Sequence, residues 1–234
     1  RVDGAFLISL IWSLGCTTDE GGRIKFDTSL RQLCTADGVP KLAAAIPETN
    51  TVYDWAWVTK DLKFKSWLEI VPSFSIAPTA QFQDILVPTL DTIRYGYILE
   101  TQLHNDYPVM FCGETGTGKS VMVKEKLMKG MGDDFLSHFM NFSANSKANQ
   151  TQDIIDGKVD KRRKGVFGPP LGKKLVVFVD DLNMPNKEAY GAQPPIEILR
   201  QMLHWGGWWD RREIEWRQLV DTIYVAAMGL PGGG

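Results

Sequence analysis

The chain has 234 residues, which is enough for one large domain or for one and a half small ones. Hydrophobic residues make up 44% and charged residues 23%, as in ordinary soluble globular proteins, and a net charge of −2 gives no general attraction to nucleic acid or to anionic membranes. Cys16, Cys34 and Cys112 have neither disulfide nor metal-ligand spacing, so the sequence favours a reducing compartment.

The first 45 residues have a mostly helical pattern. Apolar side chains recur at helical spacing from Phe6 to Leu14, and Gly15 follows as a stop signal. This apolar run is too short to span a bilayer. Residues 17–23 are predicted to form a loop, and 26–34 a second short helix capped by Asp27 or Thr28. Neither end of the chain resembles a natural terminus, so we expect a piece of a longer polypeptide.

The period changes to two after residue 50. Residues 51–58 and 62–70 alternate in polarity on either side of Lys60-Asp61, which predicts a β-hairpin. We expect this hairpin to be an exposed connector outside the main sheet. A proline-punctuated linker follows, and 82–106 combine a strand-like "ILVP" with an amphipathic helix.

From residue 108 onward the chain has a βαβ pattern. Apolar runs at 109–112, 139–142, 175–179 and 223–228 predict a parallel sheet that is covered on both faces by helices. Residues 156–174 form a long, basic, glycine-rich insertion. Its central run, 161–164, is flanked by glycines and aspartates, so we interpret it as a solvated insertion or an intramolecular contact and not as a nucleic-acid site.

A phosphate-binding loop lies between the first of these strands and a predicted helix over 121–128. It matches the pattern G-x-x-x-x-G-K-[ST], in which the backbone N–H groups and the helix N-terminus face a phosphate. A simple glycine turn would explain the glycines but not the lysine and the hydroxyl that follow them. The candidate nucleotide-binding residues are Gly113, Glu114, Thr115, Gly116, Thr117, Gly118, Lys119 and Ser120.

An acidic pair ends the strand over 175–179. In P-loop nucleotidases the first acid at such a strand end holds Mg²⁺ and the next positions the attacking water. Asp180 and the Ser120 hydroxyl are therefore the candidate metal ligands, and Asp181 is the candidate catalytic acid. An acidic turn at the end of a buried strand is the plainer explanation, but its distance from a phosphate loop favours the functional one.

Several stretches together closely resemble one family. "GETGTGKS", "GVFGPPLGKKLVVFVDDLNMP", "AYGAQPPIEILRQML" and "AAMGLPGGG" are similar to the third AAA+ module of dynein heavy chains, and "DDLNMP" and "GPPLGKK" are similar to the axonemal branch. The resemblance implies an α/β P-loop NTPase (AAA+) fold. It further implies that 1–45 are the helical tail of the second module, that 46–81 are a hairpin and linker, and that 82–234 are a large subdomain, incomplete at its C-terminus.

The same resemblance implies residue roles. A loop that packs on adenine would contain Leu86, Val87 and Pro88. Asp181 stands where the family usually has glutamate, and Gly229 where many AAA+ proteins have a polar sensor residue. Asn141 and Ser143 end the second strand, where a polar group often contacts the catalytic acid. The replacements at Asp181 and Gly229 favour a site that binds ATP or ADP with Mg²⁺ and hydrolyses ATP slowly.

The implied function is a regulatory nucleotide-binding module of a microtubule motor. Its expected partners are neighbouring AAA+ modules of the same heavy chain, one of which supplies an arginine to the site, and microtubules only through the intact motor. We expect no nucleic-acid or membrane partner, a ciliary or flagellar axoneme as the location, and a module interface around the tryptophans of 204–216. The alternatives are a free-standing P-loop kinase or NTPase and a structural scaffold with an empty site.

Overall fold

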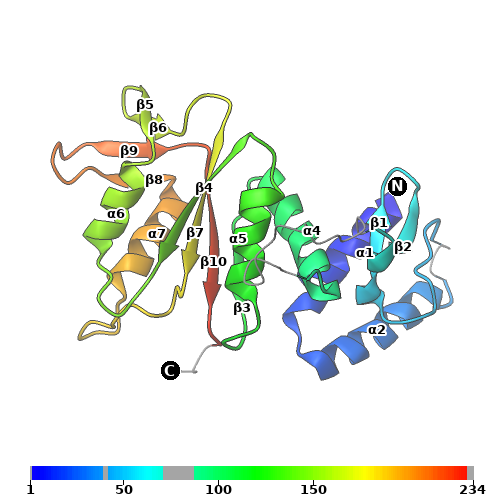
Figure 1. Cartoon of the computed structure of the whole chain (residues 1–234). Coiled ribbons are helices and arrows are strands. Elements are labelled where there is room, and N and C mark those ends of the chain that lie inside the picture. Colours follow the sequence, from blue (N-terminus) through cyan, green and yellow to red (C-terminus); the bar gives the residue numbers. More distant parts are fainter. Residues whose placement is uncertain (1, 39–41, 71–86, 231–234) are drawn as a thin grey trace, which may run out of the picture. The chain divides into compact units, whose positions relative to one another are not determined.

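A computed structural model describes residues 2–38, 42–70 and 87–230 (Figure 1). The chain divides into two compact units, residues 1–94 and 95–234, which are described separately. Within the described residues, no helix has both the length and the apolar character needed to cross a membrane.

The first unit combines helices with a small hairpin. Its elements are α1 (Val2–Ser13), α2 (Glu20–Thr35), β1 (Trp55–Val58), β2 (Lys63–Ser66) and α3 (Trp67–Ile70). The antiparallel hairpin lies outside the main sheet, as expected. The expectation that it is an exposed connector is wrong, because Trp57 and Phe64 are buried against Leu7 and Ile11 of α1. The alternating side chains thus complete a hydrophobic core.

Helix α2 begins earlier than the sequence predicts. Its N-cap is Asp19, whose carboxylate accepts a hydrogen bond of 2.7 Å from the backbone N–H of Gly22. A satisfied cap offsets the poor helix propensity of the glycines at the start of the helix, so the predicted loop over 17–23 is largely helical. The predicted caps Asp27 and Thr28 instead lie inside the helix.

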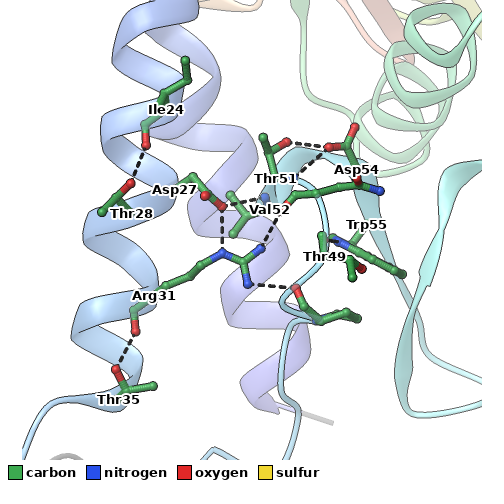
Figure 2. A network of polar contacts seen from close by, with 12 residues as sticks. Ile24, Asp27, Thr28, Arg31, Thr35, Thr49, Thr51, Val52, Asp54 and Trp55 are labelled. Carbon is green, nitrogen blue, oxygen red and sulfur yellow. Dashed lines mark hydrogen bonds and ion pairs between the residues drawn. The ribbon is translucent and has the colours of Figure 1, made fainter.

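Asp27 has a different role, shown in Figure 2. Its Oδ1 accepts hydrogen bonds from Arg31 Nε at 3.0 Å and from the backbone N–H of Val52 at 2.8 Å. The Arg31 guanidinium also donates to the carbonyl oxygens of Pro47 and Asn50, at 2.8 and 3.1 Å. This network joins α2 to the segment that leads into the hairpin, and so it holds the unit together.

The second unit contains the parallel sheet. Strands β3 (Val109–Cys112), β4 (Phe135–Asn141), β7 (Lys174–Asp180) and β10 (Thr222–Met228) lie in the order β3-β10-β7-β4. All three pairings are parallel. The predicted strands are confirmed, although β4 starts four residues before the predicted 139, at Phe135. This parallel sheet is the one that the predicted α/β P-loop fold requires.

Helices cover both faces of this sheet (Figure 1). On one face, α4 (Leu90–His104), which contains the unit boundary, and α5 (Lys119–Lys129) pack on Val176 and Phe178 of β7. On the other face, α6 (Ala148–Asp156) and α7 (Pro194–Trp205) pack on Val177 and Val179. Because alternate residues of β7 serve opposite cores, the strand is a continuous buried apolar run, as a central parallel strand requires. The strand-like "ILVP" begins outside the described residues, and its described part, 87–88, is not a strand.

A second sheet of four strands is a feature that the sequence did not predict. It contains β5 (Asp160–Arg163), β6 (Val166–Gly168), β9 (Trp216–Leu219) and β8 (Gly207–Trp209), in that order. The supposed insertion over 156–174 is thus largely a hairpin, turning at Gly165 with a φ of +72°. Arg162 makes the expected intramolecular contacts, since it donates to the Pro169 carbonyl and pairs with Asp221.

Candidate functional site

The phosphate loop lies between the end of β3 and the start of α5. Gly116 and Gly118 have φ values of +82° and +81°, in the left-handed region that favours glycine, and open space surrounds the Cβ position of both. Within the described residues, the backbone N–H groups of Glu114, Thr115, Gly116 and Gly118 donate to no other backbone group. These donors are therefore free to bind an anion, and α5 adds the partial positive charge of its N-terminus.

The Lys119 side chain folds back onto the phosphate loop. Its Nζ donates to the carbonyl oxygens of Gly113 and Glu114, at 2.9 and 2.6 Å, and lies 3.3 Å from Thr117 Oγ1. A bound phosphate would offer stronger, charged acceptors than these backbone carbonyls. The ammonium group is thus already at the loop before any ligand arrives.

Ser120 and Asp180 meet, although 60 residues separate them in the sequence. Ser120 Oγ donates to Asp180 Oδ1 at 2.6 Å, which joins the start of α5 to the end of β7. Asp180 is nearly buried, with 8% of its surface exposed. A hydroxyl oxygen and a carboxylate oxygen at this separation are the ligand types that Mg²⁺ prefers, so these residues fit the predicted metal. Bound Mg²⁺ would neutralise charge on the nucleotide phosphates.

Asp181 directly follows, in an unusual backbone conformation. Its φ is +53°, and its backbone N–H donates to Asp180 Oδ1 at 3.2 Å. Aspartate tolerates the left-handed region better than most residues. The exposed side chain of Asp181 lines the same cavity as the phosphate loop.

A cavity of about 200 Å³ joins these groups. Its walls are the loop and the first turn of α5, the acidic pair at the end of β7, and residues 227–229 at the end of β10. The carboxyl ends of parallel strands are where open α/β sheets bind ligands. The predicted loop residues, Ser120, Asp180, Asp181 and Gly229 are therefore brought to one edge of the sheet.

The remaining predicted residues are those of the adenine loop, which falls outside the second unit, and the pair at the end of β4. Leu86 lies outside the described residues, and Val87 and Pro88, which are exposed, belong to the first unit. In the described part of the chain, Asn141 and Ser143 make no side-chain hydrogen bond to Asp181. Asn141 instead pairs with Asp180 in the sheet register and lines a larger hollow of about 890 Å³ between β4 and α6. That hollow contains no phosphate-loop residue.

Two further side chains at the site were not singled out from the sequence. Lys124 Nζ lies 3.2 Å from Asp180 Oδ2, and Asn183 Oδ1 accepts a hydrogen bond of 3.3 Å from the backbone N–H of Gly229. Lys124 follows Ser120 by four positions, which is the spacing of neighbours on one helix face. That spacing was the only available signal for Lys124.

Shifted pKa values occur elsewhere in the second unit. Burial raises the pKa of the Asp156 carboxyl, to which the buried Trp208 donates a hydrogen bond of 3.0 Å. Backbone N–H groups of Glu213 and Arg212 lower the pKa of Asp210. The sequence predicted a module interface around the tryptophans of 204–216. Trp208 is buried in the core of its own unit, whereas Trp205 and Trp209 are exposed.

Comparisons with known proteins agree with this geometry. Residues 74–234 match the family model described as the P-loop containing dynein motor region, and residues 1–69 match the dynein heavy chain AAA lid domain. Dynein axonemal heavy chain 1 of Mus musculus is 46% identical over 246 residues, which cover 98% of this chain and 6% of the relative. Dynein axonemal heavy chain 12 of Mus musculus is 44% identical over 241 residues, or 98% of this chain and 8% of the relative.

The chain therefore spans only a small fraction of the length of these relatives. Its similarity to them runs through both units, which does not favour a free-standing P-loop kinase or NTPase. With its phosphate loop, its acidic strand end and its parallel sheet, the chain belongs to the AAA+ motor region of the axonemal dynein heavy chains.

Proposed function

We propose that this chain forms a regulatory AAA+ module, the third of its heavy chain, that binds ATP or ADP with Mg²⁺ and hydrolyses ATP slowly. The observation that carries the proposal is the convergence of Lys119, Ser120 and Asp180 on one cavity at the carboxyl edge of the sheet. A lysine, a hydroxyl and a carboxylate around free backbone N–H groups are what a nucleotide triphosphate with its metal requires.

Slow hydrolysis follows from the two residues that would handle the attacking water. Asp181 has a side chain that is one C–C bond, about 1.5 Å, shorter than that of glutamate. Gly229 has no side chain, although the Asn183 amide beside it places one polar group at the end of β10. An error of about 1 Å in the placement of the water can cost roughly a hundredfold in rate. The nucleotide would then set the shape of the assembly without powering it.

The same proposal covers the organisation of the chain. Residues 1–45 would be the helical tail of the second module, 46–81 a hairpin and linker, and 82–234 the large subdomain of the third. Val87, Pro88 and Leu86 would pack on the adenine. The partners would be the neighbouring modules of the heavy chain, and microtubules would be bound only by the whole motor. The names of the axonemal relatives support a location in a ciliary or flagellar axoneme.

Nucleotide titration tests the binding part of this proposal. The intact heavy chain is titrated with ADP and with ATP in the presence of Mg²⁺, alongside Lys119→Ala. Since Lys119 is the principal cation of the loop, the variant should bind at this site at least about tenfold more weakly, or about 1.4 kcal/mol. Lys129→Ala is the matched control, because Lys129 lies at the far end of the same helix and its side chain is 69% exposed. Equal affinities in the parent and Lys119→Ala would refute the proposal.

A further inference from the structure

Lys124 makes a contact that no part of the phosphate-loop motif explains. It lies one helical turn after Ser120 in α5, and its Nζ is 3.2 Å from Asp180 Oδ2. Ser120 holds the other oxygen, Oδ1, at 2.6 Å. Two side chains on one face of α5 therefore hold both oxygens of a nearly buried carboxylate.

The position of this cation differs from that of Lys119. Lys119 lines the cavity, and in the described part of the chain its Nζ donates to atoms of its own loop, whereas Lys124 contacts Asp180 and is not part of the cavity wall. The Lys124 side chain is 44% exposed, and its Nζ lies 5.9 Å from the centre of the Phe178 ring. Lys124 can therefore affect a ligand in the cavity mainly through Asp180.

Two electrostatic effects follow from this arrangement. The ammonium group offsets the negative charge of Asp180, which would otherwise repel the phosphates of a nucleotide bound without metal. It also shares the carboxylate with any divalent cation, because like charges compete for the same negative group. Both effects reduce the difference between nucleotide binding with metal and nucleotide binding without it.

We propose that Lys124 is a positioning residue that makes nucleotide retention at this site only weakly dependent on divalent metal. This inference rests on the proposed nucleotide-binding function. Lys124 keeps the Asp180 carboxylate neutralised and directed at Ser120 when the metal is absent, so ADP stays bound after its Mg²⁺ has left. The ligand class is a nucleoside diphosphate with or without its metal.

A purely structural ion pair is the simpler explanation of the same contact. Removing it would lower the thermal stability of the chain but would change ADP affinity equally with and without metal. The ratio of the two ADP dissociation constants, in EDTA and in Mg²⁺, therefore separates the two roles. A change in thermal stability alone does not separate them, because both roles predict it.

The experiment measures this ratio in the intact heavy chain with a fluorescent ADP. Binding at this site is defined as the signal that Lys119→Ala removes. The positioning role predicts that Lys124→Met raises the ratio at least about fivefold, because the uncompensated carboxylate repels metal-free ADP and attracts Mg²⁺. Lys124→Arg, which keeps the charge, should stay close to the parent. Lys129→Met is the matched control on the same helix and should leave the ratio unchanged.

Each outcome is decisive. A parental ratio in Lys124→Met overturns the inference, and so does an equal rise in Lys129→Met, which would indicate a general charge effect. If Lys124→Met does not fold, Lys124→Gln carries the same test, since it removes the charge but can still donate a hydrogen bond to Asp180. If Lys119→Ala removes no ADP signal, the proposed function itself fails. If it removes the signal while Lys124→Met keeps the parental ratio, only this inference fails.

Discussion

Lengthening the candidate catalytic acid by one methylene, Asp181→Glu, sets two effects against each other. The longer side chain moves its carboxylate about 1.5 Å farther from the backbone. If the water is now misplaced by about 1 Å, restoring its position is worth up to roughly a hundredfold in rate, or about 2.7 kcal/mol. Against this, residue 181 has a φ of +53°, where a residue other than glycine, asparagine or aspartate costs about 1–2 kcal/mol.

The backbone strain at residue 181 lowers the stability of the folded chain, whereas the longer side chain lowers the barrier to hydrolysis. We therefore expect Asp181→Glu to hydrolyse ATP at this site about tenfold faster or more, with a slightly lower unfolding temperature. Single-turnover hydrolysis in the intact heavy chain measures the rate, and the signal removed by Lys119→Ala defines this site. Asp181→Asn is the control, because it suits the same backbone but has no carboxylate. An unchanged rate in Asp181→Glu, with ADP affinity intact, would refute the argument from reach.

Three further predictions concern single side chains. Gly229→Asn should add to the rate gain of the glutamate variant in the same assay, because it supplies the polar side chain that Gly229 lacks. The new side chain fits, since its Cβ would lie in ordinary contact, 3.7 Å from Asn183 Nδ2, and a slower double variant would contradict this. Arg31→Met should lower the free energy of unfolding of the first unit by about 2 kcal/mol in chemical denaturation, because two carbonyls lose their donor and the Asp27 carboxylate keeps the Val52 N–H but loses the guanidinium. The exposed Arg200→Met should cost less than about 0.5 kcal/mol, and equal losses would contradict the role of the network. Burial lowers the pKa of His138, so the stability that its neutral ring allows is present above its unfolded pKa of about 6.5 and is lost as the pH falls below that value. The unfolding temperature should therefore drop less between pH 7.5 and pH 5.5 in His138→Phe than in the parent, and an equal drop would contradict this.

The sequence was sufficient for the main sheet and the phosphate loop because both depend on local patterns. A buried parallel strand must be continuously apolar, and 175–179 meet that requirement. The left-handed backbone at Gly116 and Gly118 requires residues without a Cβ, so the loop is visible in the sequence as glycines at fixed spacing. The prediction that Ser120 and Asp180 hold the same metal relied on the pattern of P-loop nucleotidases, in which an acid at a strand end accompanies the phosphate loop.

The parts that were missed depend on contacts between distant segments. Strand β5 is a run of charged residues, Asp160–Arg163, with no apolar alternation, and its hairpin joins the second sheet only through the pairing of β6 with β9. The early start of α2 depends on the cap at Asp19, which outweighs the helix-breaking tendency of Gly21 and Gly22. Lys124 acquires its partner only once α5 lies against the end of β7. No local period records such contacts.

Slow hydrolysis at this site determines which nucleotide stays bound after the site has been loaded with ATP. Isotopically labelled ATP is given to the intact heavy chain for a single turnover with Mg²⁺, free nucleotide is removed, and the retained species is identified in the parent and in Lys119→Ala. We expect the parent to retain labelled ATP or ADP at this site well after the remaining label has been released, and Lys119→Ala not to retain it. Equal retention in both chains would contradict nucleotide binding at this site, and prompt cleavage and release in the parent would contradict slow hydrolysis.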